Sequence, residues 1–220
     1  MLDLLFNWRA YSPLDVVFIL LSYAMIILIA LPVHELAHAF AADRMGDPTA
    51  RWNGRLTLNP LAHLDVVGTL MILFFRFGYA KPVPVNPRNF REYKKGMIIT
   101  SVAGPLSNLA LSLASLAILR LLLFVPSPPL FSHLATILLW NFAQVNIFLA
   151  IFNLMPVPPL DGYRIISNFI PPRWAYSIER YQLFITIGFI VLVLGGRFGY
   201  IIQFIANPIF KLFLFITGLG

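Results

Sequence analysis

The sequence has no cysteine, and charged side chains make up only 11% of its 220 residues. Without cysteine the chain forms no disulfide and offers no thiolate to zinc, so any bound metal must be held by His, Asp or Glu. With 59% hydrophobic residues and so few charges, the composition excludes an ordinary soluble globular domain. We expect an all-α polytopic membrane protein embedded in a lipid bilayer.

Acidic residues are especially scarce, at nine against sixteen Lys and Arg, which gives a net charge of +7. In a soluble protein this excess would suggest nucleic acid as a partner. Here the basic residues lie between apolar runs, as in loops held on the cytoplasmic side of a membrane, and nine of the sixteen fall between Arg44 and Lys95. We therefore expect a multi-pass protein of the cell membrane that binds no nucleic acid.

Long apolar runs predict five or six membrane segments within a single integral membrane domain, residues 1–220. The first run, residues 13–42, exceeds the roughly 20 residues that cross a bilayer as a helix. Further spans are expected at residues 97–125 and 134–155, and one or two more at residues 181–218. The functional core is expected within residues 13–165.

Two shorter stretches in the basic region predict other structures. The apolar run 66–75 is short for a span and is flanked by bases, which favours a re-entrant hairpin, with a tilted helix as the alternative. The segment Arg55-Leu56-Thr57-Leu58-Asn59 alternates polar and apolar residues and indicates a short strand. The edge of this strand would pair with an extended peptide substrate. If the chain cleaves peptides at a metal site, proline at Thr57 should weaken the cleavage without removing the metal.

Near the end of the first span the sequence reads His34-Glu35-Leu36-Ala37-His38. On a helix the two histidines are one turn apart on the same face, so both imidazoles can bind one Zn²⁺, and Glu35 can act as the general base toward the attacking water. The alternative is a pair of buried histidines bonded to other polar groups, which is costly at membrane depth. The pattern predicts one hydrolytic zinc site per chain.

A catalytic zinc usually has three protein ligands, so the two histidines need a partner. Asp161 is favoured because it follows the proline-broken segment 156–160, which enters from the same side as the histidines. Its alternatives are to cap the following turn or to pair with Arg164. The site is then expected toward the cytoplasmic side. The other candidate ligands are His63, Asp65 and His133. His63 and Asp65 could instead order a loop or form hydrogen bonds to the metal-binding side chains. His133 is expected on the opposite side of the membrane from the histidine pair.

Asn153 comes just before the same proline-broken segment. A neutral amide at this place can donate a hydrogen bond to the oxyanion that forms when a peptide carbonyl is attacked. The alternative is an amide that only packs helices together, which is how we interpret Asn141, Gln144 and Asn146.

In combination these motifs resemble the site-2 protease family of intramembrane zinc metalloproteases, in its compact bacterial form without an appended soluble domain. One departure is Asp65-Val66-Val67-Gly68, where the family commonly has a proline after the aspartate, and it bears on the geometry of the local hairpin. The resemblance rests on the pentapeptide 34–38, on Gly54 to Pro60 running into His63-Leu64-Asp65, on Lys81-Pro82-Val83-Pro84-Val85-Asn86, on Ala103-Gly104-Pro105 with Asn108, and on Asn153 through Gly162.

The resemblance implies that His34, His38 and Asp161 bind zinc, that Glu35 is the general base, and that Asn153 contacts the oxyanion or the substrate. Members of this family cleave transmembrane segments of other membrane proteins, often membrane-tethered regulators, commonly after a first cut by another protease. We therefore expect an endopeptidase of regulated intramembrane proteolysis. A zinc-binding membrane transporter would need more ionisable residues within the spans, and a non-proteolytic membrane scaffold would not need Glu35.

Overall fold

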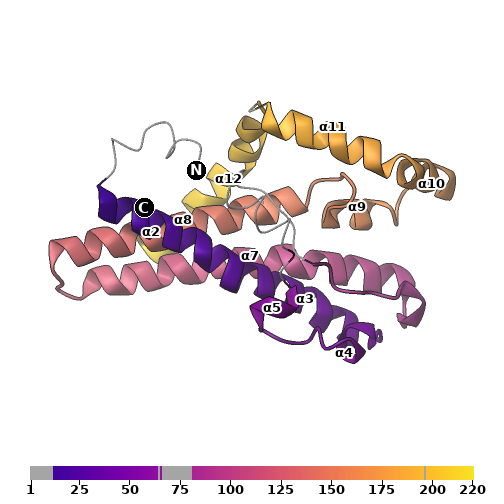
Figure 1. Cartoon of the computed structure of the whole chain (residues 1–220), viewed down its shortest axis with the longest axis horizontal. Helices are drawn as coiled ribbons and strands as arrows, with labels where there is room; N and C mark the ends of the chain where they lie inside the picture. Colours follow the sequence, from indigo (N-terminus) through magenta and orange to yellow (C-terminus); the bar gives the residue numbers. More distant parts are fainter. Residues whose placement is uncertain (1–11, 64, 66–80, 196) are drawn as a thin grey trace.

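The computed structural model describes residues 12–63, 65, 81–195 and 197–220, which fold into helices without any strand among them (Figure 1). This confirms the all-α class. The elements are α2 (Pro13–Met25), η2 (Ile26–Ala30), α3 (Leu31–Arg44), α4 (Thr49–Trp52), α5 (Pro60–His63), η3 (Pro87–Asn89), α7 (Tyr93–Phe124), α8 (Pro129–Asn153), α9 (Asp161–Ile166), α10 (Pro172–Arg180), α11 (Gln182–Leu194) and α12 (Arg197–Thr217).

Four helices in the described part of the chain are long and apolar enough to cross a membrane. They are the continuous helix Pro13–Arg44, α7, α8 and residues Gly199–Thr217 of α12. The pair α10 and α11, bent by 69°, adds a fifth if it counts as one span. The protein is therefore polytopic, as expected. The run 66–75, predicted to be a re-entrant hairpin, lies outside the described residues.

The first helix widens just before Pro32. Proline has no N–H for the helical hydrogen bond, and its ring crowds the carbonyl of the residue four positions earlier. The preceding turn, η2, is π-helical, and the Leu31 N–H donates to the Ile26 carbonyl five residues earlier. Such turns often lie beside functional sites. Here three residues separate the turn from the pentapeptide, and Pro32 among them is the local sequence signal for the turn.

The central helix is α7, whose most extensive contacts are with α8 and α3. Its buried positions include the small or polar residues Gly104, Ser112 and Ser115. The Ser115 hydroxyl donates to the Leu139 carbonyl of α8 at 2.9 Å. Small side chains let helices approach closely in lipid, which accounts for the close packing of α7 against its neighbours.

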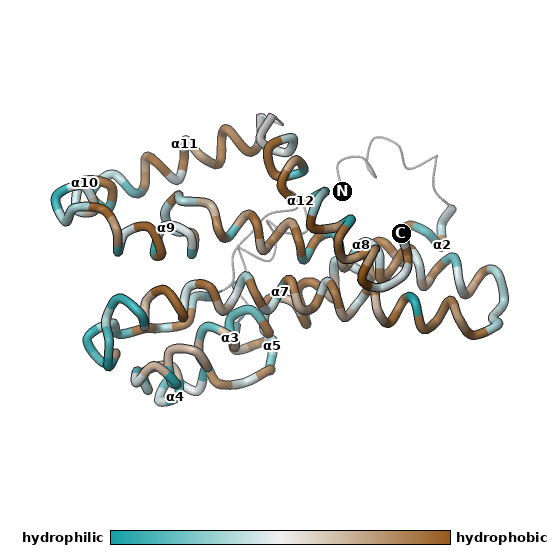
Figure 2. Tube along the Cα trace, turned by 180° about the vertical axis from the view of Figure 1, so that it is seen from behind, coloured by the Kyte–Doolittle hydropathy of each residue, from teal (hydrophilic) through white to brown (hydrophobic). Residues whose placement is uncertain are grey.

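Hydrophilic residues gather at one end of the molecule, where α4, the start of α7 and α10 lie (Figure 2). The other end holds the start of α2, and there His133 Nε2 lies 2.9 Å from Asp15 Oδ1. Asp15 and His34 are separated by about 28 Å of helix at 1.5 Å per residue. His133 is therefore remote from the pentapeptide, as expected.

The predicted strand Arg55–Asn59 does not form, and that prediction is wrong. The segment is irregular because it folds around His63 of α5 instead of pairing along an edge. The buried Arg55 guanidinium donates to the Ala62 carbonyl, and His63 Nε2 donates to the Thr57 carbonyl at 2.8 Å. These bonds to side chains take the place of a ladder between strands.

Candidate metal centre and active site

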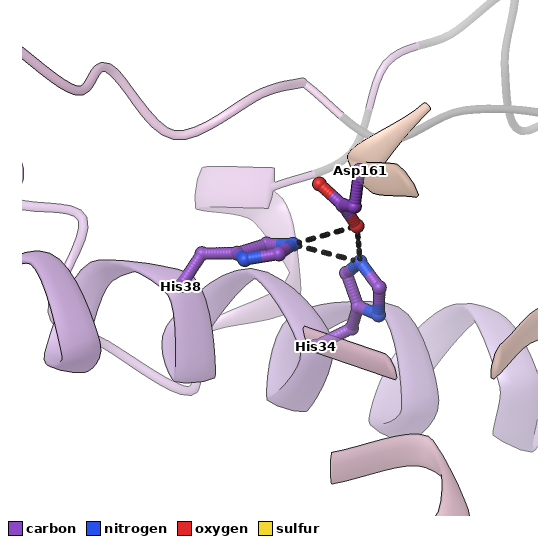
Figure 3. Close-up of side chains that lie close together, drawn as sticks. All are labelled: His34, His38 and Asp161. Atoms are coloured by element: carbon purple, nitrogen blue, oxygen red, sulfur yellow. Dashed lines mark hydrogen bonds and ion pairs between the residues drawn. The ribbon is translucent and has the colours of Figure 1, made fainter. Parts of the chain in front are cut away.

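Three side chains from distant parts of the sequence converge at the end of the first span (Figure 3). His34 and His38 are one turn apart in α3, and Asp161 is the first residue of α9. The two Nε2 atoms are 3.0 Å apart, and Asp161 Oδ2 lies 3.4 Å from that of His34 and 3.2 Å from that of His38. All three side chains are buried, and their ligand atoms are close enough to hold one metal ion.

The Nδ1 atom of each imidazole forms a hydrogen bond, which leaves the Nε2 atom for a metal. His38 Nδ1 lies 2.7 Å from the Thr100 carbonyl oxygen, which only accepts, so this nitrogen carries the proton. His34 Nδ1 lies 3.2 Å from Oδ1 of the buried Asn108. Both Nε2 lone pairs then point toward each other and toward a carboxylate oxygen. A cation among these atoms would remove the repulsion between their lone pairs. Hydrogen bonds at Nδ1, like the two here, orient histidines that bind metals through Nε2.

Gly104 of α7 leaves the space that a cation needs. A Cβ atom at this position would lie 2.4 Å from His38 Nε2 and 2.6 Å from His34 Nε2. These separations are far shorter than a van der Waals contact, so any side chain here would cover the ligand atoms. Two imidazoles and one carboxylate also form a donor set typical of catalytic zinc. The residues present therefore fit Zn²⁺.

Asp161 reaches the histidines because α9 begins directly against the end of α8. Prolines keep residues 154–160 out of regular helix, and the chain turns back at once. A Cβ atom on Gly162 would lie 2.1 Å from the Leu154 carbonyl oxygen, so glycine permits this approach. Arg164, the alternative partner of Asp161, makes no ion pair with it among the described residues, and the carboxylate faces the histidines instead.

Glu35 lies beside the three ligand residues and is half-buried. Its Oε2 atom accepts a hydrogen bond from the Val83 backbone N–H at 3.2 Å. Val83 belongs to segment 81–86, which has no regular secondary structure and whose prolines have no N–H to offer. One oxygen of the carboxylate is thereby held by the backbone of this segment, and the side chain is oriented along the wall of a cavity.

This cavity has a volume of about 260 Å³ and adjoins the ligand residues. Glu35, Asn153 and the three ligand residues line it, together with apolar side chains of segment 81–86 and of α8. The Glu35 carboxylate and the three residues that could hold a metal thus line one cavity.

Asn153 lies on the cavity wall, and its side chain also bonds within its own helix. Its Nδ2 atom donates to the Leu149 carbonyl at 3.0 Å, which is the bond of a helix-packing amide. The amide also has a second N–H and a carbonyl oxygen, for which the described residues show no hydrogen bond. The role of Asn153 toward an oxyanion stays a prediction.

The other predicted residues do not line the cavity in the part of the chain that the structure describes. None of Arg55, Leu56, Thr57, Leu58 and Asn59 is among the described residues that line it, so their contact with a substrate stays a prediction. His63 is fully buried and bonded to the Thr57 carbonyl, not to the metal-binding histidines. The role of His63 and Asp65 around the ligands also stays a prediction.

The groups that support the histidines come from α7 instead. Thr100, Gly104 and Asn108 are spaced four residues apart and therefore share one face of this helix. They provide a carbonyl to His38, room for a cation and an amide to His34. This spacing is a sequence signal that could have identified them.

Comparisons with known proteins place the chain in a family. The model of Peptidase family M50 matches residues 129–195, which contain α8 and Asp161. The chain is 39% identical over 211 residues to "Putative zinc metalloprotease YwhC" of Bacillus subtilis (strain 168), an alignment that covers 92% of this chain and 94% of that protein.

More distant relatives carry similar names. The chain is 29% identical over 172 residues to "Putative zinc metalloprotease Rip2" of Mycobacterium tuberculosis (strain ATCC 25618 / H37Rv), an alignment that covers 76% of this chain and 64% of that protein. It is 37% identical over 148 residues to "Putative zinc metalloprotease MJ0611" of Methanocaldococcus jannaschii, an alignment that covers 64% of this chain and 66% of that protein. No solved structure matches the chain. The chain belongs to peptidase family M50, which confirms the resemblance of its motifs to site-2 proteases.

Proposed function

We propose that this protein is an intramembrane zinc endopeptidase that hydrolyses peptide bonds within or near transmembrane segments of membrane proteins. The observation that carries the proposal is that Asp161, at the start of α9, meets His34 and His38, which lie with Glu35 on a helix long and apolar enough to span a membrane. The first three residues would hold one Zn²⁺, in keeping with relatives named as zinc metalloproteases. When bound, Zn²⁺ supplies a Lewis acid that acidifies water and polarises a peptide carbonyl.

The chain's own residues move the proton and orient the site. Glu35, held at one oxygen by the Val83 N–H, takes the proton of the attacking water and passes it to the leaving amine. Thr100 and Asn108 keep the two imidazoles in the tautomer whose Nε2 faces the ligand site. Asn153 donates its second amide N–H to the oxyanion.

We further propose that the site faces the cytoplasmic side of the cell membrane. It lies toward the end of the molecule where hydrophilic residues gather (Figure 2), and positive loops stay cytoplasmic. The substrates would be membrane-tethered regulators, released by regulated intramembrane proteolysis after a first cut by another protease. A substrate helix must unwind locally, because helical carbonyls are bonded and shielded from attack.

The test is Glu35→Gln, which keeps the shape of the side chain and removes the base. We expect one zinc per chain, as in the wild type, and a fall in the cleavage of co-expressed membrane proteins by about 10²–10⁴-fold. Zinc is measured by elemental analysis of the purified protein. Continued cleavage by the variant would refute the assigned base. If the wild type binds zinc and cleaves no membrane protein, a transporter or a scaffold is the better description.

A further inference from the structure

A second cavity, of about 410 Å³, opens between α2, α8 and α12, and the proposed mechanism does not use it. Its wall carries three carboxamides, Gln144 from α8 and Gln203 and Asn207 from α12. Phe148 lines both this cavity and the active-site cavity, so the two are neighbours along α8. Most of the remaining wall is apolar. We call this space the carboxamide cavity.

The three carboxamides make no hydrogen bond within the part of the chain that the structure describes, and all three side chains are exposed. Other amides of α8 behave differently, since Asn141 and Asn146 each donate to the carbonyl four residues earlier. All three lie on helices long and apolar enough to span the membrane. An unpaired amide in hydrocarbon is costly, so these groups call for a polar partner that enters from outside.

We propose that the carboxamide cavity recognises a polar side chain in the transmembrane segment of the substrate, an inference that rests on the proposed function. A carboxamide both donates and accepts, so it pairs with an amide, a hydroxyl or a backbone group freed from a helix. Hydrogen bonds of this kind hold helices together in lipid. A purely apolar segment has nothing to offer these groups and would leave them unpaired.

The position of the cavity sets a distance to the cleaved bond. Gln144 precedes Asn153 by nine residues of α8, which is about 13 Å along the helix at 1.5 Å per residue. A substrate segment running beside α8 covers this distance with about nine residues as a helix, or about four when extended. The recognised polar residue is therefore expected roughly four to nine residues from the cleaved bond.

The absence of cysteine makes a direct test practical. Ala206 lines the cavity and carries no amide, so Ala206→Cys adds one thiol and leaves all three carboxamides in place. The variant is combined with Glu35→Gln and reconstituted in phosphatidylcholine vesicles. The probe is a single-span peptide of leucine and alanine with one asparagine next to one cysteine. The comparison peptide has leucine in place of the asparagine. Disulfide formation under mild oxidation is then measured for both.

We expect about three- to tenfold more crosslinking to the asparagine peptide than to the leucine peptide, as one or two hydrogen bonds in lipid would produce. Equal crosslinking of both peptides would overturn the proposal. Crosslinking between two copies of the protein, in preference to the peptide, would also overturn it and identify the cavity as an interface between copies. This readout needs no cleavage, so it stands apart from failure of the proposed function.

A triple variant with Gln144→Leu, Gln203→Leu and Asn207→Leu separates recognition from packing. We expect it to crosslink both peptides equally and to remain folded, because it removes amides that have no partner among the described residues. Asn141→Leu is the matched control, since it removes an amide of α8 that lies outside the cavity and should leave the preference intact. A preference that persists in the triple variant would contradict the proposal.

Discussion

At the scale of single residues, the space for a metal ion depends on Gly104, which has no side chain. His34, His38 and Asp161 are the residues that could hold the ion, and Gly104 on another helix leaves the Nε2 atoms of both histidines open. A carbonyl and an amide from the same face of α7 then fix both rings. The ligand set and its surroundings thus come from three helices that meet at one point.

Gly104→Ala should abolish zinc binding, because the added methyl group would lie against both Nε2 atoms. We expect the zinc content of the purified protein to fall by more than about tenfold, with cleavage lost in parallel. Gly188→Ala on α11 is the control, since a Cβ atom there meets no atom within 4 Å. Full zinc content in Gly104→Ala would show that the metal lies elsewhere.

At the scale of elements, segment 81–86 is held in place by Asp47, which follows α3. The fully buried Asp47 carboxylate accepts hydrogen bonds from the Asn86 N–H at 2.7 Å and from Asn89 Nδ2 at 2.8 Å. It also binds the backbone N–H and the hydroxyl of Thr49. Asp47 therefore ties the end of α3 to the segment whose Val83 N–H holds Glu35.

Asp47→Asn should loosen this segment, because an amide nitrogen would replace an oxygen that now faces a donor. We expect a loss of about 1–3 kcal/mol in unfolding free energy and weaker cleavage with unchanged zinc, measured by thermal unfolding in detergent and by elemental analysis. Asp43→Asn is the control, since Asp43 pairs with the largely exposed Arg51 and such a surface pair contributes little. Equal losses in both variants would refute the special role of Asp47.

The same carboxylate predicts a pH dependence. Burial by itself raises the pKa of Asp47, but the hydrogen bonds from Thr49, Asn89 and Asn86 outweigh it and hold the pKa below its usual 3.8. Because the folded state binds the proton less readily than the unfolded state, the stabilisation is complete above the usual pKa and is lost as the pH falls through the lowered value. Thermal scans of wild type and Asp47→Asn should therefore converge in acid, and a constant difference would contradict this.

At the scale of the whole molecule, the two ends differ in polarity, and this predicts an orientation. Single cysteines can be introduced without background because the chain has none. Asn53→Cys and Tyr176→Cys lie at the hydrophilic end, and Val125→Cys lies in the turn at the other end. With an impermeant maleimide, we expect labelling of the Val125 variant in intact cells and of the other two only after permeabilisation. The reverse pattern would place the active site outside.

Much of this protein was determined by the sequence alone, because hydropathy and helical spacing are local properties. They predicted the all-α membrane class, the first span and the placing of both histidines and Glu35 on it, with Asp161 as the favoured partner. Only the tertiary structure decided that Asp161 faces the histidines and not Arg164, that Arg55–Asn59 folds around His63, and that α7 supports the ligands. These outcomes depend on contacts across long separations, 62 residues for His38 with Thr100 and 74 for His34 with Asn108, which no local pattern contains.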